Sequence, residues 1–141
     1  MKINQISLFL ENKPGHLNAV CRTLAEAQIN IVTLSLADTQ QFGIVRLIVE
    51  EWQKAKTVLE QAGYVVNVRE VVAATVPDRP GGMAEVLDAV SQAGVNIEYM
   101  YAFALRRNVR AVLLFRFEDP DAAIEVLQKA GIGIVQEADM Y

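Results

Sequence analysis

The stretch that decides the fold is Asn12-Lys13-Pro14-Gly15-His16-Leu17, which recurs 66 residues later as Asp78-Arg79-Pro80-Gly81-Gly82-Met83. Asn30-Ile31 recurs at the same offset as Asn96-Ile97. Further on, Val58-Leu59 with Ala62-Gly63 recurs as Val126-Leu127 with Ala130-Gly131, at an offset of 68. Landmarks that keep one order at a nearly constant offset indicate two copies of one unit. The second copy therefore has two extra residues, which we place in a turn near residues 106–108, where insertions are tolerated best.

The same succession of patterns runs through both copies. Alternating apolar residues at positions 6, 8 and 10 predict a strand. After Pro14-Gly15, apolar residues at i, i+3, i+4 and i+7 spacing predict a helix with one apolar stripe. A hairpin over residues 31–38 and 43–49 follows, and then a second helix that ends before Gly63, since a helix often ends at a glycine with positive φ. A closing strand, near residues 64–68 and 132–137, completes each βαββαβ unit.

This order predicts an α+β fold of two ferredoxin-like units in tandem, over residues 1–69 and 70–141, with the helices on one face of the sheet. We expect the units to pair into an eight-stranded antiparallel sheet. No linker rich in glycine or serine separates them, because the first unit runs through Arg69-Glu70 almost directly into the second. Asp119 before Pro120 predicts an N-cap with proline at the first helical position.

Composition argues against several classes of protein. The chain has 141 residues, 52% of them hydrophobic, and its net charge of −4 includes no basic stripe of the kind that binds nucleic acid. One cysteine and one histidine cannot form a disulfide framework or a structural zinc site, and we expect neither metal nor cofactor. The polar start and the short apolar runs predict a cytoplasmic protein without a membrane segment. The sequence contains no acid, base or nucleophile beside a suitable partner, and no phosphate-binding loop. It therefore does not predict an enzyme.

The candidate ligand site lies where each Pro-Gly turn leads into a helix. A helix N-terminus offers unpaired N–H groups and a partial positive charge, both suited to a carboxylate. Asn12 and Asp78 stand just before these turns, and an asparagine follows 18 residues after each, as Asn30 and Asn96. Oxygen atoms of such side chains can accept hydrogen bonds from an ammonium group. Together these groups fit a zwitterion, and the charge of Asp78 predicts the tighter of the two sites.

The pattern Asn/Asp-x-Pro-Gly-x-Leu/Met followed by Asn-Ile resembles the ACT domain, a regulatory module of amino-acid metabolism, over essentially the whole chain. The resemblance implies domains that pair through sheet edges and bind amino acids at the interface of the pair. It also implies a free-standing regulatory protein, since the chain has no catalytic domain. His16 and Gly82 occupy a position that is usually apolar in the family, so the identity of the ligand stays open.

By this resemblance, the ligand-binding residues of both copies are Asn12, Pro14, Gly15, His16, Leu17, Asn30, Ile31, Asp78, Pro80, Gly81, Gly82, Met83, Asn96 and Ile97. The implied partners are an amino acid, a second copy of the chain in a homodimer, and an enzyme of amino-acid metabolism. Two other interpretations remain. The loops can be turns that only cap helices, and the chain can be a dimerisation or regulatory subunit that docks on a metabolic enzyme and binds no ligand.

Overall fold

The structure is a computed structural model that describes residues 1–107 and 110–141, and the side chains of these residues except 38–39, 104–107 and 110. Backbone contacts divide the chain into two compact units. We call residues Asn4–Arg69 the first unit, and Glu70–Tyr141 together with Met1–Ile3 the second unit. No helix in the described part of the chain is long and apolar enough to cross a membrane.

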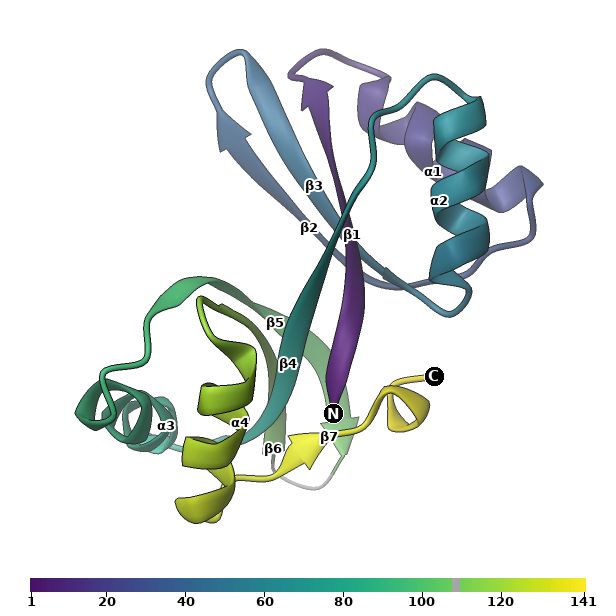
Figure 1. Ribbon diagram of the computed structural model, residues 1–141. Helices are drawn as coiled ribbons and strands as arrows, with labels where there is room; N and C mark the ends of the chain where they lie inside the picture. The colour runs from purple at the N-terminus through teal and green to yellow at the C-terminus, as the bar shows by residue number, and fades with distance from the viewer. Residues whose placement is uncertain (108–109) are drawn as a thin grey trace. The chain divides into compact units, whose positions relative to one another are not determined.

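The first unit is a three-stranded antiparallel arrangement with two helices on one face. Its elements are β1 (Lys2–Glu11), α1 (His16–Glu26), β2 (Ile31–Thr39), β3 (Phe42–Val49) and α2 (Trp52–Gln61). β3 lies between β1 and β2 and pairs antiparallel with both. Figure 1 shows α1 and α2 side by side on the same side of these strands.

The second unit repeats this plan and adds a short strand. Its elements are β4 (Asn67–Pro77), α3 (Gly82–Gln92), β5 (Ile97–Arg107), β6 (Arg110–Phe117), α4 (Pro120–Lys129), β7 (Ile134–Val135) and a 3₁₀ turn, η1 (Glu137–Asp139). β6 pairs antiparallel with β4 and with β5, and β7 pairs antiparallel with β4. The helices α3 and α4 lie side by side, as α1 and α2 do (Figure 1).

Each unit has its own core between its helices and its strands. Alternate strand residues point toward the helices, as the two-residue period of a strand requires. In the first unit the fully buried members include Ile6, Leu8, Val45, Leu47, Leu24 and Leu59. In the second they include Val72, Ala74, Phe115, Phe117, Val86 and Leu127. The rings of Phe115 and Phe117 stack with their centroids 5.4 Å apart.

The predicted fold class is confirmed, with one strand fewer than expected. The described residues form seven strands, because the closing strand of the first copy and the opening strand of the second are one element, β4. β4 starts at Asn67 and continues to Pro77, since residues 68–76 contain no glycine, proline or other turn signal that would end it. The predicted closing strand of the second copy is also shorter, with only Ile134–Val135 paired.

Several local predictions are confirmed. Gly63 and Gly131 follow α2 and α4 with φ of 95° and 74°. The Ala122 N–H donates to Asp119 Oδ1 at 3.1 Å, so Asp119 caps α4 ahead of Pro120. One local prediction is wrong: the sequence predicts the two extra residues of the second copy in a turn, but they lie in a strand. β5 has 11 residues where β2 has 9, and its pairing with β6 shifts register between Phe103 and Arg107. Asn108, part of the predicted insertion, falls outside the described residues.

The alternation in β1 leads to a stability prediction. Leu8 is 1% exposed in the core, whereas its neighbour Phe9 points to the other face and is 62% exposed. Leu8→Ala should lower the free energy of unfolding by about 2–5 kcal/mol, because it removes buried methyl groups and leaves a cavity. Phe9→Ala, the matched control, should change it by no more than about 0.5 kcal/mol. Urea denaturation of both variants measures the free energy of unfolding. Equal decreases in the two variants would contradict the assignment of Leu8 to the buried face of β1 and Phe9 to the exposed face.

Candidate functional site

In the first unit, residues 12–15 connect the end of β1 to the start of α1. Gly15 has φ 87° and ψ −15°, a left-handed conformation that strains any residue with a Cβ. A Cβ on Gly15 would meet no atom within 4 Å, so the backbone conformation and not the space requires glycine. The Ala19 N–H donates to the Gly15 carbonyl at 2.9 Å and begins the helix. The predicted role of Gly15 in the turn is thus seen directly.

Asn12 joins this loop to the turn between β2 and β3. Its backbone N–H donates to the Gln41 carbonyl at 2.9 Å, and its side-chain Nδ2 donates to the Gln40 carbonyl at 3.1 Å. Gln40 itself has a φ of 50°. Two bonds from one residue fix the distance between the loop and the hairpin turn. Asn12 is therefore a structural member of the site whatever else it contacts.

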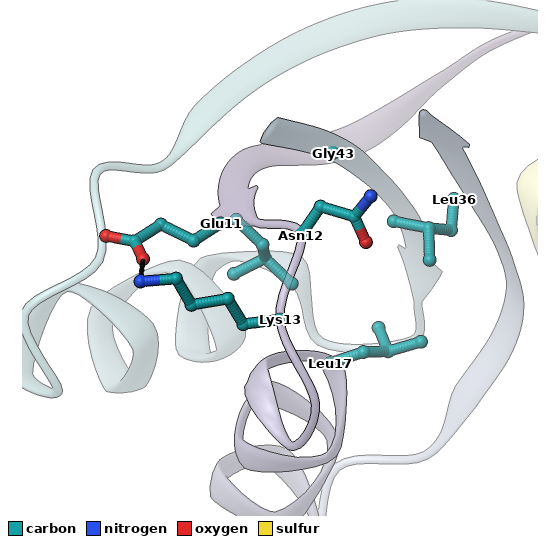
Figure 2. Close-up of a pocket in the computed structure, with 7 residues that line it drawn as sticks. Glu11, Asn12, Lys13, Leu17, Leu36 and Gly43 are labelled. Carbon is teal, nitrogen blue, oxygen red and sulfur yellow. Dashed lines mark ion pairs between the residues drawn. The ribbon is translucent and has the colours of Figure 1, made fainter. Parts of the chain in front are cut away.

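A cavity of about 220 Å³ opens beside this loop, entirely within the first unit. Three leucines from three different elements and the backbone of one glycine form its apolar part. Figure 2 shows the carboxamide of Asn12 extending toward Leu36 and Leu17, whereas the side chains of Glu11 and Lys13 point away from Leu36. The complete lining is Leu10, Glu11, Asn12, Lys13, Leu17, Leu36 and Gly43.

The cavity depends on Gly43. The strand register places Gly43 opposite Leu10, on the face of β3 that also presents Val45 to the helices. Every other residue on this face of β3 has a buried side chain, so a glycine leaves space. A Cβ at this position would come within 2.9 Å of Leu36 Cδ1. Hence even the smallest side chain would enter the space between β3 and Leu36.

The second copy has an alanine at the corresponding position. Ala111 lies 68 residues after Gly43 and pairs with Val76, just as Gly43 pairs with Leu10. Sequence reasoning did not select Gly43 as a site residue. A lone glycine inside a strand pattern, replaced by alanine in the repeat, is the signal that would have found it.

An ion pair lies at the rim of the cavity. Lys13 Nζ is 2.9 Å from Glu11 Oε2. The hydrogen bond and the positive charge of Lys13 lower the pKa of Glu11 from its ordinary value of 4.5, and His16 adds a smaller attraction. The pKa of Lys13 is raised in turn. Both groups are thus held in their charged forms, each by the other.

The loop of the second unit has the same backbone but is closed. Gly81 has φ 85° and ψ −13°, nearly the values of Gly15. The next residue, Gly82, is buried, and a Cβ on it would overlap the carbonyl oxygen of Pro77. In the first unit the corresponding residue is His16, whose side chain is accommodated half-buried. The end of β4 therefore lies closer to α3 than the end of β1 lies to α1.

A second ion pair reinforces this closure. Arg79 NH2 is 2.6 Å from Glu85 Oε1, which belongs to the first turn of α3. Lys13, the counterpart of Arg79, instead pairs backward with Glu11, and the second copy has Pro77 where the first has Glu11. Arg79 consequently links the second loop to the first turn of α3, whereas Lys13 makes no such link in the first unit's ion pair. A cavity of about 160 Å³ in this unit lies beside the end of β4, and none of the predicted site residues lines it. Its lining is Thr75, Pro77, Glu85, Val86, Ala130, Gly131, Ile132 and Gly133.

The two asparagines that recur in the repeats, Asn30 and Asn96, do not lie beside the loop of their own unit. Asn30 and Asn96 are exposed and precede β2 and β5. β1 and β2 both run antiparallel to β3, so Asn30 lies at the opposite end of the strands from Asn12. Eight residues of strand separate the ends by about 27 Å, at about 3.4 Å per residue. That a ligand joins the loop of one unit to the asparagine of another stays a prediction.

The remaining predicted residues lie in the wall of the cavity, in the cores or in the exposed turns. Leu17 both lines the cavity and packs against the first core. Ile31 packs against the first core, and Met83 and Ile97 pack against the second. Pro14 and Pro80 lie in the turns, where they are exposed. No group of three or more His, Cys, Asp or Glu side chains able to hold a metal ion occurs among the residues that the structure describes.

Comparisons with known proteins agree with this fold. The sequence model of one family, described as "ACT domain pair", matches residues 1–141. The crystal structure of protein BT0572 from Bacteroides thetaiotaomicron is 40% identical, with a TM-score of 0.92, over 100% of this chain and 96% of that one. No protein of curated function is significantly similar in sequence.

Two further structures are regulatory subunits of aspartate kinase. The ligand-free subunit from Thermus thermophilus is 24% identical with a TM-score of 0.66, over 90% of this chain and 91% of that one. The subunit from Thermus flavus is 22% identical with a TM-score of 0.62, over 91% and 92%. At these identities the two structures show a shared fold and nothing further.

The rim ion pair should be visible as a pH effect. A carboxyl group whose pKa is lowered by folding stabilises the protein above its unfolded pKa and loses that effect as the pH falls through the folded value. Lys13→Met should therefore raise the pKa of Glu11 toward 4.5, as followed by a carbon-13 NMR titration. Lys129→Met is the control, because Lys129 pairs with Glu125 and should alter only the pKa of Glu125. An unchanged Glu11 pKa in Lys13→Met would refute the pair.

The closure of the second loop predicts that alanine at residue 82 destabilises the protein more than alanine at residue 16, the corresponding position of the first loop. Gly82→Ala should destabilise the protein by about 1–3 kcal/mol, since the Pro77 carbonyl must move to admit a Cβ. His16→Ala, at the corresponding position of the first loop, should cost less than about 0.5 kcal/mol. Chemical denaturation of both variants provides the measurement. A neutral Gly82→Ala would mean that the second loop has room for a side chain.

Proposed function

The chain belongs to the ACT domain pair family, and from this premise we propose that it is a non-catalytic regulatory protein that binds an amino acid. In this proposal residues 1–69 and 70–141 are two ACT-like domains, and the protein acts in the cytoplasm as a homodimer. The ligand contacts are those predicted from the repeated loops, and the first loop is the principal site.

The observation that carries the proposal is the cavity at the first loop. Its wall of leucines suits an apolar group, and the start of α1 provides backbone N–H groups suited to a carboxylate. Charged groups of both signs, Glu11 and Lys13, lie at its rim. An amino acid has about ten heavy atoms. A space of about 220 Å³ holds about seven waters at about 30 Å³ each, so the sizes correspond.

The structural neighbours suggest a partner. Two of them are regulatory subunits of aspartate kinase. We propose that this chain likewise transmits ligand binding to an enzyme of amino-acid metabolism. The shared fold supports this proposal.

A second candidate function is pairing or docking without a ligand. β2 is the outermost strand of the first unit's β2-β3-β1 arrangement, and its Leu34 and Leu36 are 40% and 51% exposed. Exposed apolar residues on an outer strand favour contact with another chain. The two functions are compatible. Only ligand binding requires that a side chain filling the cavity should abolish the affinity for an amino acid.

The test is a screen of the twenty amino acids by thermal shift, followed by calorimetric titration. We expect at least one to bind with a Kd between about millimolar and micromolar, as the free energy per heavy atom of a small ligand allows. At a hundredfold excess over Kd it should stabilise the fold by about 2.7 kcal/mol. Gly43→Val should abolish this binding, because its side chain fills the cavity. Ala111→Val adds comparable volume in the second unit and should leave binding intact. If no amino acid raises the melting temperature at about 10 mM, the ligand-free function is favoured.

A further inference from the structure

We infer that the ligand of the first-unit cavity is an amino acid with an uncharged aliphatic side chain, of about the size of valine to leucine. The inference rests on the proposed function and goes further by naming the class of side chain. It depends on three features of the cavity: what forms its wall, how its charged groups are already paired, and how much space Gly43 leaves.

The apolar wall of the cavity consists of leucines, and the polar side chain nearest to it is the carboxamide of Asn12. Leu10 is 6% exposed on β1, Leu17 comes from the first turn of α1, and Leu36 comes from β2. The one residue on β3 that lines the space is Gly43, which has no side chain. A polar ligand group placed against this wall would lose its hydrogen bonds to water and gain none in exchange. An aliphatic group would instead bury apolar surface on both partners.

The charged groups of the rim disfavour a charged ligand side chain. Glu11 and Lys13 form an ion pair at 2.9 Å and hold each other in the charged state. A lysine or aspartate side chain could bind one of them only by separating the pair. Figure 2 shows both side chains pointing away from Leu36, and Asn12 extending toward it. The charged residues therefore lie at one end of the space, and Leu17 and Leu36 lie at the other, with the Asn12 carboxamide between them.

The space sets an upper limit on size. Gly43 provides the depth of the cavity, and a single added Cβ there would already contact Leu36. At about 30 Å³ per water-sized group, about 220 Å³ holds the five main-chain heavy atoms of an amino acid and about two side-chain carbons. The remaining carbons of valine or leucine would lie against Leu36, which is 51% exposed. An aromatic side chain would extend past Leu36 into solvent and leave much of its surface exposed.

The experiment is calorimetric titration of the full chain with L-alanine, L-valine, L-leucine, L-threonine, L-aspartate, L-lysine and L-phenylalanine. L-valine or L-leucine should bind most tightly. Each methylene removed from the ligand should weaken binding by about fourfold, the factor that corresponds to about 0.8 kcal/mol. L-threonine, close in shape to L-valine, should bind at least tenfold more weakly, because its hydroxyl would lose its hydrogen bonds to water where it lies against Leu17 and Leu36.

Two variants test whether the cavity wall contacts the ligand side chain. Leu36→Ala changes the wall, and Leu34→Ala changes a neighbour on the same face of β2 that does not line the cavity. Leu36→Ala should weaken L-leucine binding by about tenfold or more and leave L-alanine binding nearly unchanged. Leu34→Ala is the matched control, since Leu34 is comparably exposed but does not line the cavity, and it should bind as the unaltered chain does.

The outcomes distinguish this inference from the proposed function. Preferred binding of L-threonine, L-lysine or L-aspartate that Gly43→Val abolishes would overturn the inference and leave the proposed function standing. Equal effects of Leu36→Ala and Leu34→Ala on L-leucine would also overturn it, because Leu36 would not contact the side chain. Binding of no amino acid at all would overturn both.

Discussion

The left-handed backbone at Gly15 and Gly81 is the constraint on which the rest of the site depends. In both units it turns the chain from the end of a strand into the start of a helix, with φ of 87° and 85°. Any other residue would cost about 1–2 kcal/mol in this conformation. Because the turn fixes where the helix begins, it also fixes which strand residues the helix can cover. The apolar stripes of α1 and α3 consequently meet corresponding positions, such as Leu8 and Ala74.

Since the two turns have the same backbone, the differences between the loops come from the residues around them. Gly43 in the first unit corresponds to Ala111 in the second, and His16 corresponds to Gly82. The first exchange removes volume beneath the first loop. The second allows the Pro77 carbonyl to approach α3, which a side chain on Gly82 would prevent. The repeats thus share a scaffold but differ in the space beside the loop: the cavity of the first unit is lined by Asn12, Lys13 and Leu17, and that of the second by Pro77, Glu85 and residues 130–133.

The fold could be predicted from the sequence because its signals are local. Gly63 and Asp119 act within a few residues of their own positions, as a helix end and an N-cap, and both were predicted correctly. The strand count was wrong because residues 67–77 contain no turn, while the repeat suggested a division there. Gly43 was missed for a different reason. Its importance depends on the register that sets it opposite Leu10, and register is a relation between distant parts of the chain.

The same geometry bears on whether the charge of Asp78 makes the second site the tighter one. A charged acceptor exceeds a neutral one by about 0.5–2 kcal/mol, from typical values of about 1.5–3 and about 1. Separating Arg79 from Glu85, whose side chains are both half-exposed, would cost only about 0–1 kcal/mol. These two quantities alone would leave the second site favoured. The Pro77 carbonyl, however, is backbone held in β4, so no side-chain rotation moves it away from Gly82. The second loop therefore has no room for a side chain at residue 82, whereas the corresponding position of the first loop holds His16 beside a cavity that is already formed. That the Asp78 site is the tighter one thus stays a prediction, because the charge of Asp78 favours the second loop and the preformed cavity favours the first.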